Sequence, residues 1–236
     1  MTADDIAALF TQGDDFLCAR WGRPVAPVVF GLDDASLSIF RDALKAVVAH
    51  ARHPLADTDP ETGANLMIFA VEDWDDLRAV TDLDRLTGIA DLPGRLAAQS
   101  ADRYRLLRFD ADGAIRACMT FLRLGGALGQ AHPAALAEDA GVNAMLSFAR
   151  HATPSPDLAR LIRAAYDPAL PSCARDPSHA LRLAASLAAP CPTASRSASI
   201  TRIPTWVRWS ITPTTCASSN APAANGCARA GSTSWR

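Results

Sequence analysis

The chain has 236 residues, of which 49% are hydrophobic, and a formal net charge of -2 at pH 7. This length and composition are typical of one large globular domain, with or without an appendage. The near-neutral charge gives no general case for binding nucleic acid or an anionic membrane, and no run of about eighteen apolar residues indicates a membrane span.

The first residues favour a cytoplasmic location. Residues 1–10 include Asp4 and Asp5 where a secretory signal needs basic residues, and they contain no long apolar segment. The 6 cysteines have no short paired spacing such as Cys-x-x-Cys, which favours isolated thiols over a disulfide framework.

An amphipathic helix over residues 1–20, interrupted at Gly13, is predicted to open the chain. A strand over residues 25–30 follows, and we expect it near a sheet edge because Pro24 and Pro27 cannot donate to a ladder. The next helix is the clearest element: Asp33 or Asp34 can cap its first amides and Pro54 marks its end. Its apolar stripe consists of Leu37, Phe40, Leu44, Val47, Val48 and Ala51.

Residues 64–71 have no polar alternation, which predicts a central strand covered on both faces. With the preceding strand and helix they complete a β-α-β unit. Asp73 can then cap a further helix, and a looser helical stretch follows around Leu92 and Leu96.

Residues 103–124 are predicted to form a hairpin whose turn is Asp110-Ala111-Asp112-Gly113. A three-residue loop over residues 111–113 would set Arg108 opposite Arg116, where two like charges repel unless water or an anion lies between them. It would also place Arg105, Leu107 and Phe109 on one core-facing side with Ile115, Ala117, Met119 and Phe121.

Three helices complete the expected domain. One covers residues 133–150, the second begins at Ser155-Pro156-Asp157 with a side-chain cap and a proline, and the last opens at Asp176-Pro177. The fold class is therefore α+β: a mixed sheet of about four strands, including a β-α-β unit and a hairpin, covered by helices. We assign residues 1–188 to this single domain.

Residues 189–236 differ in composition from the rest and are interpreted as an irregular tail. No Asp or Glu occurs from residue 177 to the end, although acids are frequent before it. One interpretation is a flexible or extended tail. The other is an out-of-frame translation, since residues 203–235 can be re-read in a shifted frame, with permissively chosen wobble bases, as a helical pattern with acids. The coding DNA sequence decides between them.

Two groups of residues are candidate sites, and no catalytic residue is predicted. His50 and His53, three apart at a helix end, could bind a metal with Asp57. Favourable charge at a helix carboxyl end is the preferred explanation, because Pro54 breaks the helix and no His-Glu-x-x-His motif supports a metal. Arg105, Arg108 and Arg116 could form an anion-binding face on the hairpin, or an ordinary solvated sheet face. No cofactor is expected.

The segments 64–77, 137–145 and 161–170, together with the hairpin, resemble a proteobacterial family whose members include candidate lipoproteins. The layout of that family is similar to that of degenerate zincin-type peptidases. The resemblance covers residues 21–188, but the chain lacks a lipoprotein signal and has no zinc-binding helix motif over residues 136–146. The resemblance therefore implies no activity for this chain.

These observations favour a non-catalytic binding or interaction module of a soluble bacterial protein. Its partner would be an unknown protein or a small acidic ligand, with neither nucleic acid nor membrane involved. The alternative is a hydrolase, metal-dependent through His50 and His53, so the sequence leaves open whether the protein is an enzyme.

Overall fold

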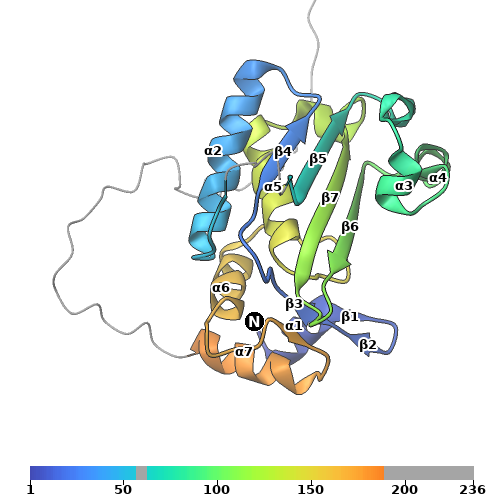
Figure 1. Cartoon of the computed structure of the whole chain (residues 1–236). Helices are drawn as coiled ribbons and strands as arrows, with labels where there is room; N and C mark the ends of the chain where they lie inside the picture. Colours follow the sequence, from blue (N-terminus) through green and yellow to red (C-terminus); the bar gives the residue numbers. More distant parts are fainter. Residues whose placement is uncertain (57–62, 189–236) are drawn as a thin grey trace, which may run out of the picture. The chain divides into compact units, whose positions relative to one another are not determined.

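A four-stranded mixed sheet forms the centre of this computed structural model, which describes residues 1–56 and 63–188 (Figure 1). The strand order is β4-β5-β7-β6, in which β4, β5 and β7 are parallel and β6 is antiparallel to β7. The strands are β4 (Pro27–Phe30), β5 (Leu66–Val71), β6 (Arg103–Phe109) and β7 (Ile115–Arg123). The predicted α+β class is confirmed, with β4 at an edge and β5 inside the sheet.

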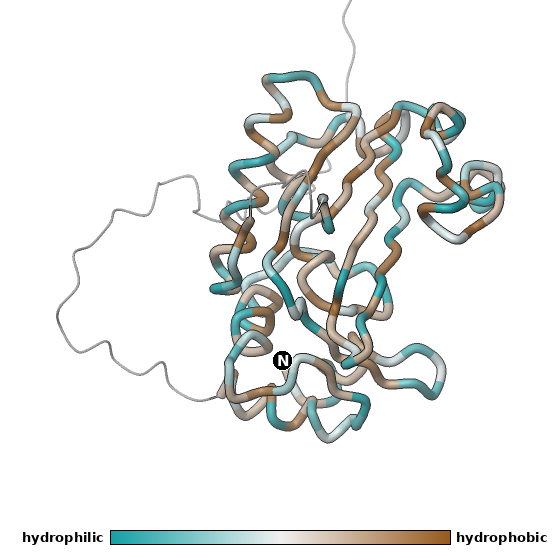
Figure 2. Tube along the Cα trace, viewed as in Figure 1, coloured by the Kyte–Doolittle hydropathy of each residue, from teal (hydrophilic) through white to brown (hydrophobic). Residues whose placement is uncertain are grey.

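Helix α2 (Asp34–His50) connects β4 to β5 and completes the predicted β-α-β unit. Asp33 caps it, because its Oδ1 accepts hydrogen bonds from the backbone amides of Ala35 and Ser36, each 3.0 Å away. Its inner stripe includes Phe40 and Leu44, both buried, and Figure 2 shows hydrophobic and hydrophilic residues alternating along the helix. Both the cap and the buried stripe match the sequence prediction.

Helices cover both faces of the sheet, which explains why β5 has no polar alternation. One face packs against α2 and α5 (Pro133–Met145) through residues such as Ile68 and Leu122. The other face packs through Phe69 and Phe121 against a separate cluster formed by the short helices η1 (Trp74–Ala79), α3 (Leu83–Thr87) and α4 (Leu92–Ala98).

The predicted helix over residues 1–20 is wrong beyond its first half. Helix α1 (Ala3–Phe10) stops where Gly13, at φ +62°, makes the turn of a small hairpin of β1 (Thr11–Gln12) and β2 (Asp15–Phe16). Strand β3 (Cys18–Ala19) follows. The hairpin still buries Phe10 and Phe16, so the apolar spacing that predicted a helix is satisfied by a chain that folds back on itself.

The predicted register of the β6–β7 hairpin is also wrong. An irregularity between Arg108 and Phe109 pairs Arg108 with Ala117 and leaves Arg116 outside the register. A one-residue shift moves every later side chain to the other face, so Arg105 shares its face with Thr120 rather than with Met119.

The helix predicted over residues 133–150 ends early, at Met145. Leu146 leaves the helix because it pairs with Arg20 in an isolated antiparallel bridge, and its buried side chain stays in the core. The remaining elements are η2 (Ala127–Gln130), α6 (Pro156–Ala165), β8 (Cys173–Ala174) and α7 (Ser178–Ala188). Ser155 caps α6 as predicted, by accepting a hydrogen bond from the amide of Leu158 at 3.1 Å.

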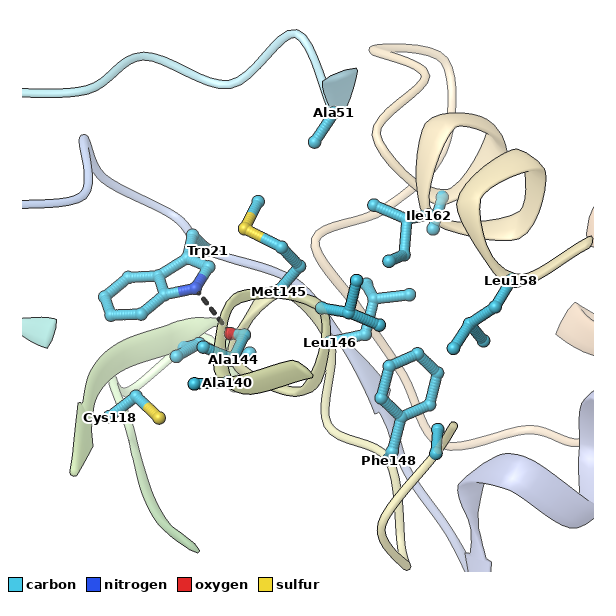
Figure 3. Packing of buried hydrophobic residues seen from close by; sticks show 14 of the residues in the cluster. Trp21, Ala51, Cys118, Ala140, Ala144, Met145, Leu146, Phe148, Leu158 and Ile162 are labelled. Atoms are coloured by element: carbon cyan, nitrogen blue, oxygen red, sulfur yellow. Dashed lines mark hydrogen bonds between the residues drawn. The ribbon is translucent and has the colours of Figure 1, made fainter. Parts of the chain in front are cut away.

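Trp21 joins the sheet and α5 to a lower layer that contains α1, α6 and α7 (Figure 1). Its side chain is 1% exposed, and its indole Nε1 donates a hydrogen bond of 2.8 Å to the carbonyl of Ala144 (Figure 3). The same layer contains the antiparallel pair of β3 and β8, in which Cys18 faces Ala174.

None of the described helices combines the length and the hydropathy needed to span a bilayer. The predicted tail, residues 189–236, lies outside the described residues, and so does the out-of-frame hypothesis that concerns it.

Gly31 is a position where only glycine fits, which gives a stability prediction. Its φ is +85°, and an added Cβ would lie 1.8 Å from the carbonyl oxygen of Ala70, whereas a Cβ at Gly13 would meet no atom within 4 Å. We expect Gly13→Ala to lower the free energy of unfolding by about 1–2 kcal/mol, the cost of positive φ alone. Gly31→Ala should cost at least about 2 kcal/mol more, because it adds an overlap with backbone. Urea denaturation measures both, and equal losses would contradict the placement of β4 against β5.

Candidate functional site

A cavity of about 360 Å³ lies where the segment after β3 meets the turn of the β6–β7 hairpin. We call it the Arg20 cavity. Four stretches distant in sequence line it: residues 20–24, His53 with Pro54, the hairpin turn with Asp110, Asp112 and Ala114, and Ser172. Its position therefore depends on the lower layer being docked on the end of the sheet.

Backbone hydrogen bonds hold Arg20 in place. Its amide donates to the carbonyl of Ser172 at 2.9 Å, and its carbonyl accepts from the amide of Ile115 at 2.8 Å. The next residue, Trp21, forms an isolated parallel bridge with Ile115 and is anchored through its indole, so both neighbouring backbone positions are defined. The side chain of Arg20 consequently leaves a fixed point of the backbone.

The Arg20 guanidinium is only partly satisfied by the protein. Its Nη2 donates to the carbonyl of Leu170 at 3.1 Å, and its Cζ lies 5.6 Å from the centre of the Tyr166 ring. Its Nε is buried and has no hydrogen-bond partner. No carboxylate of residues 1–56 or 63–188 forms an ion pair with it. An unpaired buried donor on a cation is costly unless an anion or water satisfies it.

The ring of Tyr166 packs against the guanidinium of this arginine. Its hydroxyl donates to the carbonyl of Met145 at 2.7 Å and accepts from the amide of Trp21 at 3.4 Å. Burial raises the pKa of Tyr166 above its ordinary value, so the phenol stays neutral. The aromatic face is thus a fixed platform against which the Arg20 cation rests.

His53 lines the same cavity through a half-buried ring. Its Nε2–H donates to the carbonyl of Arg23 at 2.8 Å, and the ring meets the edge of Tyr166 with centroids 5.1 Å apart. Burial lowers the pKa of His53 below its usual value, and the charge of Arg20 adds to this. The neutral ring that results keeps its hydrogen on Nε2, so Nδ1 is left as an acceptor.

The hairpin turn forms an acidic wall. Asp110 Oδ1 accepts hydrogen bonds from the amides of Asp112 at 3.0 Å and Ala114 at 2.9 Å, which fixes the carboxylate. A Cβ at Gly22 would lie 2.9 Å from the Cβ of Ala114 and 3.3 Å from Asp110 Oδ2. Glycine therefore lets the segment after Arg20 approach the turn this closely.

The two histidines of the predicted metal site bind different backbone carbonyls. His50 Nε2–H donates to the carbonyl of Ala159 at 3.0 Å, facing α6, while His53 faces the Arg20 cavity. Among the described residues no group of three or more His, Cys, Asp or Glu side chains could hold a metal ion. Asp57, the third predicted ligand, lies outside the described residues, and the metal site stays a prediction.

The three predicted anion-binding arginines are dispersed. Arg105 points under α5, where it donates through Nη1 to the carbonyls of Asn143 and Leu146 and through Nη2 to that of Phe148. Arg108 lies on the opposite face of β6 and donates to the carbonyl of Thr87, whereas Arg116 is exposed. Arg105 therefore satisfies the carboxyl end of a helix, where a cation is favourable.

A second polar cluster joins β6 to α5. Asp139 accepts from Arg103 Nη1 at 2.9 Å and lies 3.0 Å from His151 Nε2. This carboxylate–imidazole contact resembles part of a hydrolytic triad. The neighbouring serines are occupied, because the Ser147 hydroxyl donates to the carbonyl of Leu17 at 2.8 Å and Ser155 caps α6. Neither of these two serines is therefore free to act as the nucleophile that such chemistry needs.

A larger cavity of about 660 Å³ lies beside α3 and α4. Arg78, which lines it, is paired with Asp75 at 2.9 Å and with Asp91 at 3.1 Å. Arg78 is therefore already paired with carboxylates at the surface, in contrast to Arg20, which makes the Arg20 cavity the better candidate site.

Arg20, Arg23 and Asp110 were missed as site residues by the sequence interpretation. The sequence places Arg20 at the end of a predicted helix and Asp110 in a turn. The available signal was the short run Arg20-Trp21-Gly22-Arg23-Pro24, where a glycine lies between two arginines and a proline follows them. Comparisons with protein-family models, curated proteins and solved structures found no match. The chemistry of the cavity itself is thus the basis for a function.

The role of Arg105 gives a second prediction. Arg105→Met should lower the free energy of unfolding by about 2–4 kcal/mol, because it leaves three partly buried carbonyls without donors. Arg116→Met removes an exposed arginine from the same hairpin and should change the free energy of unfolding by about 0.5 kcal/mol at most. Urea denaturation of both variants measures this difference, and similar values for the two would exclude the helix-capping role.

His53 predicts a pH dependence of stability. The unfolded chain binds a proton near the usual pKa of 6.5, while burial lowers the pKa in the folded state. Below about pH 6.5 the unfolded state therefore binds more protons, so stability decreases as the pH falls. His53→Gln cannot titrate but keeps an N–H donor for the Arg23 carbonyl.

The stability of wild type relative to His53→Gln should thus be greater at about pH 7.5 than at about pH 5.5. Unfolding free energies of both proteins at the two pH values test this. A difference that does not change with pH would contradict a lowered His53 pKa, whereas His179, also lowered by burial, contributes equally to both proteins.

Proposed function

We propose that this domain is a non-catalytic binding module that holds the acidic group of a small ligand on Arg20. The observation that supports the proposal is the unneutralised Arg20 guanidinium at the cavity: its Nη1 makes no hydrogen bond and it has no carboxylate counterion among the described residues. A carboxylate or a phosphate is the natural partner for such a group, because each can accept two parallel N–H bonds.

The size and rigidity of the cavity also support binding. A volume of about 360 Å³ is at the small end of the usual range of ligand pockets, roughly 300–1,000 Å³. The Leu170 carbonyl and the Tyr166 ring hold the guanidinium without neutralising it. A pre-positioned cation loses little conformational freedom when the ligand binds, which favours affinity.

The proposal retains a cytoplasmic location and involves neither nucleic acid nor a membrane, on the sequence arguments given above. The competing hypothesis is a hydrolase that depends on a metal at His50 and His53. Metal analysis of the purified full chain separates the two proposals. Stoichiometric zinc that is lost in His53→Ala would support the hydrolase.

Calorimetric titration of the full chain with inorganic phosphate and with butyrate tests the binding proposal. We expect at least one probe to bind with a dissociation constant of about 1 mM, and Arg20→Met to weaken it at least about tenfold. Arg20→Lys keeps the charge but not the fork of donors and should weaken it less. Arg116→Met is the matched control and should bind like the wild type.

Binding that is equally strong in Arg20→Met, or no binding of any acidic probe at all, would exclude Arg20 as the anchoring residue.

A further inference from the structure

The Arg20 cavity contains opposite charges that do not neutralise each other. Two cationic side chains, Arg20 and Arg23, and two anionic ones, Asp110 and Asp112, line it. No side-chain nitrogen of either arginine lies within 4.0 Å of a carboxylate oxygen of either aspartate, so these residues form no ion pair with each other. The two poles are therefore held apart by the fold.

Each pole has unused hydrogen-bonding capacity. On the cationic side Nη1 of Arg20 makes no hydrogen bond within the described residues, whereas Nε, also without a partner, is closed off from the cavity. On the anionic side both turn amides bind Asp110 Oδ1, and Oδ2 makes no hydrogen bond within the described residues. Because the Oδ1 bonds fix the carboxylate, it cannot swing away from the cavity to find another partner without breaking the turn.

The backbone prevents the two poles from collapsing onto each other. The amide of Gly22 donates to the carbonyl of Ile115 at 3.3 Å, and the amide of Ile115 donates to the carbonyl of Arg20 at 2.8 Å. These bonds fix the segment that carries Arg20 relative to the strand that follows Asp110. The separation of the charges is thus a built property of the cavity.

This arrangement discriminates between kinds of acidic ligand. A ligand with only a carboxylate is attracted by Arg20 but repelled by Asp110. A ligand with only an ammonium group is attracted by Asp110 but repelled by Arg20. A ligand with both groups is attracted at both ends. The neutral His53 adds no third positive charge to the lining of the cavity.

We propose that the Arg20 cavity selects a small zwitterion, whose carboxylate binds Arg20 and whose ammonium group binds Asp110. The ligand class is that of amino acids and ω-amino acids of a few carbons, in keeping with the volume of about 360 Å³. This inference rests on the proposed binding function and narrows it from acidic ligands in general to ligands with two opposite charges.

A matched series of ligands tests the inference. The full chain is titrated calorimetrically with glycine, 4-aminobutyrate and 6-aminohexanoate, which differ in the spacing of their charges. Butyrate and 1-butylamine each lack one charge of 4-aminobutyrate. We expect one of the three zwitterions to bind at least about tenfold more tightly than butyrate and 1-butylamine, the equivalent of one additional charged contact.

Asp110→Asn separates recognition of the ammonium group from a structural effect. Asparagine keeps the Oδ1 acceptor for the two turn amides but loses the charge. Asp110→Asn should weaken binding of the zwitterion at least about fivefold. Binding of butyrate should stay unchanged or become tighter, because the variant removes a repulsive charge. A merely damaged cavity would weaken both ligands. Asp42→Asn, an exposed change of the same charge on α2, is the control.

The outcomes distinguish this inference from the proposed function. Butyrate that binds as tightly as every zwitterion, or a zwitterion affinity that Asp110→Asn leaves unchanged, overturns the inference but leaves Arg20 as an anion anchor. Absence of binding for all acidic probes, the zwitterions included, overturns both proposals.

Discussion

The hydrogen bond from the Trp21 indole to the carbonyl of Ala144 is the contact on which the lower half of the domain depends. It fixes a large, fully buried side chain at the carboxyl end of α5, where the helix carbonyls lack partners within the helix. Arg20 and Gly22 on either side are then bound to the start of β7. Displacing this indole would release the backbone that carries the Arg20 cavity.

Arg105 and Tyr166 satisfy the same helix end from other directions. Arg105 donates to the carbonyl of Asn143 and Tyr166 to that of Met145, next to the indole bond at Ala144. The carboxyl end of α5 thus receives donors from the sheet, from α6 and from the segment after β3. Side chains from three parts of the fold donate to these neighbouring carbonyls, and the buried backbone acceptors are thereby paired.

Elements defined by local signals were predictable from the sequence. Local patterns predicted the Asp33 cap, the apolar stripe of α2 and the uninterrupted apolar run of β5, and the structure confirms all three. Each of these features depends on residues only a few positions apart. The hairpin turn at Asp110 belongs to this group, because an aspartate binding the amides that follow it is a local preference. Its register was not predictable, since the irregularity beside Arg108 has no local composition signal.

The candidate site was largely beyond sequence reasoning because its residues act through distant partners. Arg20 meets Leu170, 150 positions away, and nothing near either residue indicates the pairing. The sequence places Arg105 on the core-facing side of the hairpin and also suggests an anion-binding face, since alternation along a strand cannot reveal a helix end placed over one face. His53 is a candidate metal ligand in the sequence, and the structure shows that its ring packs against Tyr166, 113 positions away.

The antiparallel pairing of Cys18 with Ala174 brings the beginning of the domain against its end. During synthesis on the ribosome, the amino-terminal strand must wait without a partner until almost the whole domain has emerged. Contacts between residues far apart in the sequence are the slowest to form, because the chain loses the entropy of closing a long loop before the contact can stabilise it. The contacts of the Arg20 guanidinium, with Tyr166 and Leu170, form only at that late stage, so a competent cavity is a marker that the nascent chain has finished folding.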